Sequence, residues 1–129
     1  SGSREGTVLR LCAPATRPLD GQLARLQGRT VGNRLLEVRT GVPTAEWRQC
    51  DALFLDADDS DRVLLLAQRV GSSPVLTLGD LPGFVEAGGM IGLRMEGSRV
   101  RFDVNLGSAQ RAGLVLNSQM LKLAGKVLP

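Results

Sequence analysis

ALFLDADDSDRVLLLAQRVGSSPVLTLGD, residues 52–80, contains two apolar runs separated by an acidic turn and a stretch with helical periodicity. The first run, ALFLDAD, has almost no polar interruption, which predicts a strand buried on both faces. The acidic residues at 58–61, led by Asp58 and Asp59, supply a cap and a first turn for a helix. The apolar face of that helix carries Val63, Leu66, Ala67 and Val70. PVLTLGD follows as another strand, so this stretch predicts the repeating unit of a parallel α/β sheet.

The residues before this stretch extend the same alternation. TVLRLCAP, residues 7–14, predicts a buried strand that ends at a proline. Leu19, Leu23 and Leu26 then recur at helical spacing, and Gly28 stands at the expected end of that helix. RLLEVRT, residues 34–40, predicts a second strand, and TAEWRQ, residues 44–49, a short helical turn. The order is that of a three-layer α/β/α sandwich with a mostly parallel sheet.

A different pattern follows residue 80. MIGLRME (90–96) and RVRFDVN (99–105) flank Gly97-Ser98, which predicts a C-terminal antiparallel hairpin with a two-residue turn. This turn pairs Glu96 with Arg99, Met95 with Val100, Arg94 with Arg101, Leu93 with Phe102, and Ile91 with Val104. One face is then wholly apolar and expected in the core. The other face sets Arg94 against Arg101, a like-charge pair that is unfavourable unless an acid lies nearby.

Two helices are expected after the hairpin. LGSAQRAG, residues 106–113, follows Asn105 as a candidate cap, and SQMLKLAGKVL, residues 118–128, follows Asn117 or begins with Ser118 as its cap. Residues 1–6, SGSREG, are expected to be a linker left by cloning, and residues 7–129 to form one domain.

Composition restricts the function. The 129 residues include no His, so the chain alone cannot build a His-based triad or a His-ligated metal site. The net charge of +3, with scattered Arg, three Phe and one Trp, is a poor match to nucleic-acid binding. No run approaches the roughly 18 apolar residues that a membrane span needs.

No motif predicts catalysis or a cofactor. An aspartate after the 52–55 strand resembles a phospho-acceptor position, but the acids and the lysine that phosphoryl transfer needs are missing around it, so helix capping by Asp58 and Asp59 is favoured. Gly83, Gly88 and Gly89 precede a strand rather than a helix, which disfavours a phosphate cradle. We therefore expect no catalytic residue, no metal ligand and no cofactor.

Cys12 and Cys50 fit two readings equally: buried thiols in a reducing compartment, or a disulfide in an oxidising one.

The tail PVLTLGDLPGFVEAGGMIGLRMEGSRVRFDVNLGSAQRAGLVLNSQMLKLA, residues 74–124, strongly resembles the YfiR-like family of bacterial periplasmic regulators. The resemblance rests on the combination of PGF, GGMIG, RVRFDVNL, AQRAGL and SQMLKLA, and extends more weakly over residues 7–128. It implies export to the periplasm and a disulfide between Cys12 and Cys50. It also implies that the family's usual N-terminal amphipathic helix is missing here, which favours a homodimer through the uncovered sheet face.

The resemblance implies a non-enzymatic function. The best-understood role in the family is repression of an inner-membrane diguanylate cyclase through its periplasmic sensor region, which lowers cyclic-di-GMP output. An outer-membrane lipoprotein relieves this block. The alternative is a small-molecule-sensing extracytoplasmic domain of a membrane receptor, with a crevice near Ala13, Pro14 and Asp56. The Arg-rich hairpin face and the preceding loop are the expected partner-binding surface. Its residues are Pro82, Phe84, Met90, Arg94, Arg99, Arg101 and Asp103, with Phe84 equally compatible with a core position.

Overall fold

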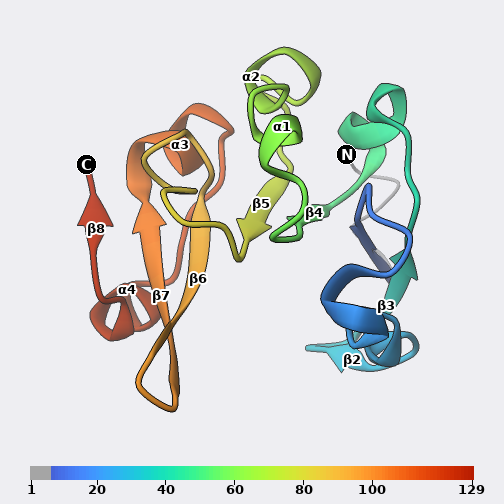
Figure 1. Cartoon of the computed structure of the whole chain (residues 1–129), viewed down its shortest axis with the longest axis horizontal. Coiled ribbons are helices and arrows are strands. Elements are labelled where there is room, and N and C mark those ends of the chain that lie inside the picture. Colours follow the sequence, from blue (N-terminus) through green and yellow to red (C-terminus); the bar gives the residue numbers. More distant parts are fainter. Residues whose placement is uncertain (1–6) are drawn as a thin grey trace.

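The computed structural model describes residues 7–129, which form an eight-stranded sheet in the order β2-β3-β1-β4-β5-β6-β7-β8 (Figure 1). The strands are β1 Val8–Cys12, β2 Thr30–Val31, β3 Arg34–Arg39, β4 Ala52–Leu55, β5 Leu76–Gly79, β6 Ile91–Glu96, β7 Arg99–Asn105 and β8 Val127–Leu128. The neighbours from β3 to β6 run parallel, and β7 is antiparallel to β6. The predicted α/β fold with a C-terminal hairpin is confirmed.

The helical segments are short. They are η2 Pro18–Gly21, η3 Leu23–Leu26, η4 Thr44–Gln49, α1 Ser60–Val63, α2 Leu66–Arg69, α3 Leu106–Arg111 and α4 Ser118–Leu123. The single helix expected over residues 19–26 is wrong. Two short 3-10 segments replace it, and Leu19 and Asp20, inside the first of them, both have positive φ. The Leu19 N–H donates to the Asp56 carboxylate at 2.9 Å, so this irregular segment closes over the carboxyl end of β4.

Two other boundaries differ from prediction. The final helix ends at Leu123, and the chain then turns into β8, which pairs in parallel with β7. The turn brings the Gly125 N–H to the Phe102 carbonyl, an approach that leaves no room for a Cβ at residue 125 beside the Arg94 guanidinium. The other unpredicted strand is β2, an antiparallel partner for the start of β3. Both are two-residue edge strands, too short to give a periodic signal.

The core lies on both faces of the sheet because side chains alternate along each strand. On one face Leu53 and Leu55 pack with Trp47, under η4, α1 and α2. On the other face Leu11 and Phe54 pack with residues of η3. A third cluster joins the hairpin base to α3 and α4. This arrangement confirms the three-layer sandwich predicted from the apolar runs.

The hairpin register is confirmed at every predicted pair from Ile91–Val104 to Glu96–Arg99. Figure 1 shows the β6–β7 turn projecting beyond the end of the rest of the sheet. We call residues 91–105 the arm and residues 94–101 the outer arm. The expectation that the whole apolar face is core is wrong for the outer arm, where Met95 and Val100 are 63% and 66% exposed. These side chains lie beyond the elements that cover the base of the sheet.

Candidate partner-binding surface

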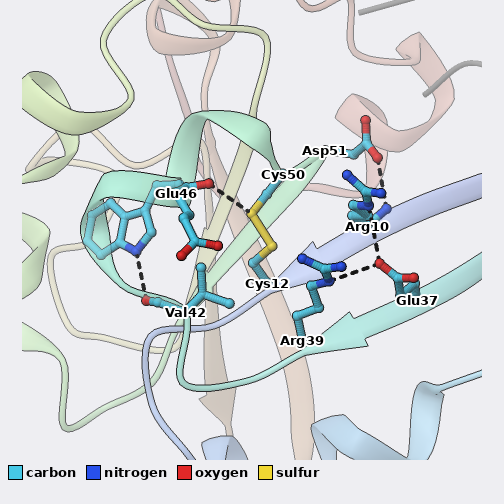
Figure 2. Close-up of a disulfide and its surroundings, with 9 residues drawn as sticks. Arg10, Cys12, Glu37, Arg39, Val42, Glu46, Cys50 and Asp51 are labelled. Carbon is cyan, nitrogen blue, oxygen red and sulfur yellow. Dashed lines mark hydrogen bonds and ion pairs between the residues drawn. A yellow bond between two sulfur atoms is a disulfide. The ribbon is translucent and has the colours of Figure 1, made fainter. Parts of the chain in front are cut away.

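A disulfide joins Cys12 at the end of β1 to Cys50, which directly follows η4 (Figure 2). Strand register alone does not bring these residues level, since Cys12 lies opposite Leu53 in β4. Cys50 instead lies in the turn that follows η4, and this turn brings its Cα to 6.1 Å from the Cα of Cys12. Both cysteines are buried. The bond therefore ties the first strand to the segment that enters the central strand.

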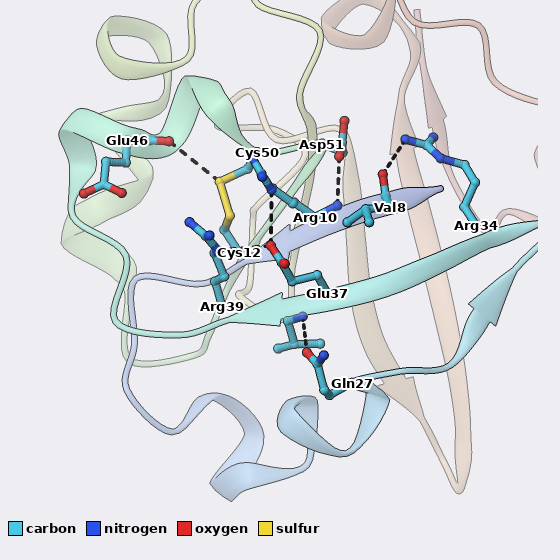
Figure 3. Close-up of polar contacts among 11 residues, drawn as sticks. Val8, Arg10, Cys12, Gln27, Arg34, Glu37, Arg39, Glu46, Cys50 and Asp51 are labelled. Carbon is cyan, nitrogen blue, oxygen red and sulfur yellow. Dashed lines mark hydrogen bonds and ion pairs between the residues drawn. A yellow bond between two sulfur atoms is a disulfide. The ribbon is translucent and has the colours of Figure 1, made fainter. Parts of the chain in front are cut away.

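Polar contacts hold β1 between its neighbours beside this bond (Figure 3). The Glu37 carboxylate accepts from the guanidinium groups of Arg10 and Arg39, at 3.2 and 3.1 Å. The backbone N–H of Arg10 donates to the Asp51 carboxylate at 2.8 Å. These contacts link β3, β1 and the start of β4. The charged groups near the disulfide therefore contact one another and hold the strands together.

Acidic residues lie beside the like-charge pair that Arg94 and Arg101 form on the arm. Arg94 donates to both Asp103 oxygens, at 3.0 and 3.2 Å, and to Glu96 at 3.0 Å. Asp103 Oδ1 also accepts the Lys126 backbone N–H at 3.0 Å. Hydrogen bonds from Arg94 hold the pKa of the Asp103 carboxyl below its ordinary value. Arg94 and Asp103 therefore belong to a local network that joins the arm to β8.

The loop before the arm does not display its apolar residues. Phe84 and Met90 are only 2% and 4% exposed. Of the two positions left open for Phe84, the structure has the core position, and the expected exposure of Met90 to a partner is wrong. The Phe84 ring lies directly against the backbone of Gly79 and Gly89, where any Cβ would overlap it. Because neither glycine has a side chain, the ring can pack against their backbone and is buried. Of the loop residues proposed for contact, Pro82 alone is exposed.

The remaining predicted residues, Arg99 and Arg101, lie on the outer arm. Neither forms an ion pair with any residue that the structure describes, and Arg101 Nε is buried without a hydrogen-bond partner there. Val100 and Leu123, from the end of α4, border the same hollow of about 390 Å³. Sequence reasoning missed Met95 and Val100 because it placed all apolar arm residues in the core. It missed Leu123 because this residue comes from α4, outside the arm.

The outer arm thus combines cationic groups that lack internal partners with exposed apolar side chains. Met95 and Val100 lie on one face, and Arg99 and Arg101 lie on the opposite face. We call this set, with Leu123, the arm surface. A surface that combines exposed apolar side chains with Arg is typical of protein interfaces.

A family model described as YfiR/HmsC-like matches residues 1–125. The chain belongs to the YfiR/HmsC-like family. This family consists of regulatory proteins rather than enzymes, and it is periplasmic. The disulfide of this YfiR/HmsC-like chain, implied by the resemblance, is present. In the part of the chain that the structure describes, no helix has the length and apolar character to cross a membrane.

Solved structures share the fold of this YfiR/HmsC-like chain. A conserved domain protein from Vibrio cholerae matches with a TM-score of 0.64 and 12% identity, over 94% of this chain and 54% of that one. The ABC domain from Streptococcus pneumoniae, solved in complex with L-Trp, matches with a TM-score of 0.68 and 15% identity, over 95% and 55%. The chain spans about half the length of these proteins. At such identities the likeness concerns the fold alone.

The acidic residues after β4 have structural partners in this YfiR/HmsC-like chain. Asp59 is buried, and its carboxylate accepts the Asp56 N–H at 2.8 Å and pairs with Arg62. Asp59 occupies the N-cap position of α1, but its side chain caps no helical N–H, which corrects the expected capping role. Burial, and then the charge of Asp56, raises the pKa of the nearby Asp80. Among residues 7–129, no three Cys, Asp or Glu side chains lie close enough together to hold a metal ion.

Proposed function

We propose that this chain is a non-enzymatic periplasmic regulator that binds the extracytoplasmic region of a membrane-bound diguanylate cyclase, or of a related sensor protein, and lowers cyclic-di-GMP output. Family membership and the disulfide support this proposal, since a disulfide between buried cysteines suits an oxidising compartment. An outer-membrane lipoprotein that competes for the regulator would relieve the block.

The observation that carries the proposal is the arm surface. Arg99 and Arg101 have no acidic partner among the described residues, whereas Arg94 on the same face is fully engaged by Asp103 and Glu96. A protein that presents carboxylates to the free guanidinium groups and apolar side chains to Val100 would complement this surface. Because these groups lie on opposite faces of the hairpin, the partner region is expected to contact both faces, with acidic groups on one side and apolar groups on the other.

A matched pair of charge reversals tests this function in the full-length protein in its native host. Arg99→Glu with Arg101→Glu is expected to raise cellular cyclic-di-GMP to the level of a strain lacking the regulator, because two like-charge contacts replace two attractive ones. Arg25→Glu with Arg29→Glu makes the same charge change at exposed positions in and after η3 and should leave repression intact. Cyclic-di-GMP is measured in cell extracts, with the abundance of each variant as a control.

Normal repression by the folded arm variant would remove the arm surface from the interface. Equal loss of repression by both variants would attribute the effect to net charge rather than to the arm. Arg94 is unsuitable for this test because its replacement would break the contact with Asp103.

A further inference from the structure

A cavity of about 270 Å³ lies between α2, the loop before β6, and α3, away from the arm surface. Leu66 and Val70 of α2 and Met90 form its apolar wall, and each of these side chains is buried. Thr77 of β5, with Ser108 and Arg111 of α3, supplies its polar groups. The volume suits a small molecule rather than a peptide or a nucleotide.

The polar groups of this cavity are one guanidinium and two hydroxyl groups, each with a hydrogen-bond partner in the chain. Arg111 donates to Ser108 Oγ at 3.1 Å, and its guanidinium also lies beside Gly107. Thr77 Oγ1 accepts the Met90 N–H at 2.9 Å. Both hydroxyl groups are used as acceptors here, and neither donates to another residue of the described chain, so their protons are available to a ligand.

The charged side chain that lines the cavity is a cation, Arg111. Arg111 forms no ion pair with any residue between 7 and 129, and no Asp or Glu lines the cavity. A guanidinium beside two donor hydroxyl groups matches a carboxylate, which accepts several hydrogen bonds at once. No Asp or Glu lines the cavity to receive an ammonium group, so a zwitterionic amino acid fits less well than a monocarboxylate.

We propose that this cavity is a binding site for a small monocarboxylate with a compact apolar body. The carboxylate accepts hydrogen bonds from Arg111 and from the Ser108 and Thr77 hydroxyl groups. The apolar body packs against Leu66, Val70 and Met90. This site is separate from the arm surface, so it is independent of the proposed partner.

Titration of the ¹⁵N-labelled chain with 4-methylpentanoate tests this site by NMR. Saturable amide shifts are expected at residues around the cavity, such as Ser72 and Gly88, with a Kd below about 1 mM. The neutral amide of the same acid and L-leucine are each expected to bind at least about tenfold more weakly, since one lacks the negative charge and the other adds an unpaired ammonium. Inorganic phosphate, as a generic anion, is expected to bind more weakly still.

A pair of variants assigns the binding to the proposed residue. Arg111→Gln is expected to weaken 4-methylpentanoate binding about tenfold or more, because it removes the charge-assisted contact. Arg69→Gln removes a nearby exposed charge that does not line the cavity and should change the Kd less than about twofold. An unchanged Kd in a folded Arg111→Gln variant would overturn the proposal. So would shifts that map elsewhere, equal binding of acid and amide, or no saturable shift with the acid.

Discussion

Replacing Phe84 by alanine is expected to lower the free energy of unfolding by about 3–5 kcal/mol, the usual cost of emptying a buried aromatic site. The Phe84 side chain is 2% exposed and fills the space above Gly79 and Gly89. Neither glycine has a side chain that could close the resulting cavity. Urea unfolding followed by circular dichroism measures the loss.

Pro82→Ala provides the matched control in the same loop. Pro82 is exposed, so its replacement is expected to change stability by less than about 1 kcal/mol. A Phe84→Ala variant that keeps wild-type stability but loses repression would contradict the core assignment and restore Phe84 as a partner contact.

Removing the disulfide with Cys12→Ala and Cys50→Ala is expected to cost about 4 kcal/mol of stability. The bond joins residues 38 positions apart. Closing a loop of this length lowers the conformational entropy of the unfolded chain by an amount equivalent to about 4 kcal/mol. The effect is large because the bond ties β1 to the segment leading into β4. It is measured from unfolding midpoints of the wild-type and variant proteins under oxidising conditions.

A reductant provides the control for the disulfide. Dithiothreitol should lower the midpoint of the wild-type protein toward that of the double variant and leave the variant unchanged. Equal midpoints for the oxidised wild type and the variant would contradict a stabilising bond. Alkylation of both cysteines in the native protein, detected by intact mass, would contradict the bond itself.

Local patterns predicted the strands well. The run at 52–55 is apolar without interruption because β4 is buried on both faces, and the alternation around Gly97-Ser98 set the hairpin register. In both cases neighbouring residues carry the information, through burial or turn geometry. The Asn105 cap was also predicted, and it accepts the Ser108 N–H. Of the two candidates for the last helix, Asn117 is the cap, and it accepts the N–H groups of Gln119 and Met120.

Features set by distant contacts were not predictable. The positive φ values of Leu19 and Asp20 accompany a hydrogen bond to Asp56, which is 37 positions from Leu19. Strand β8 depends on β7 and on the close approach at Gly125. No local pattern encodes either contact, and the helical leucine spacing at 19–26 favoured the wrong element.

The candidate surface was also predicted only where local sequence determines it. The sequence placed Arg99 and Arg101 on one hairpin face, as the structure does. It could not show how far the arm extends past the elements covering the sheet, so it assigned Met95 and Val100 to the core. It also could not show that facing glycines let Phe84 sink below the surface.

The central claim is that the outer arm contacts a membrane-bound partner, and in-cell photo-cross-linking tests it most directly. A photoreactive residue at Met95 is compared with one at Leu64, which is 79% exposed and lies at the end of α1, outside the arm. We predict that Met95 yields a covalent adduct with a membrane-bound cyclase or sensor protein, and that Arg99→Glu with Arg101→Glu abolishes it. No such adduct from Met95, or an equal adduct from Leu64, would contradict the account.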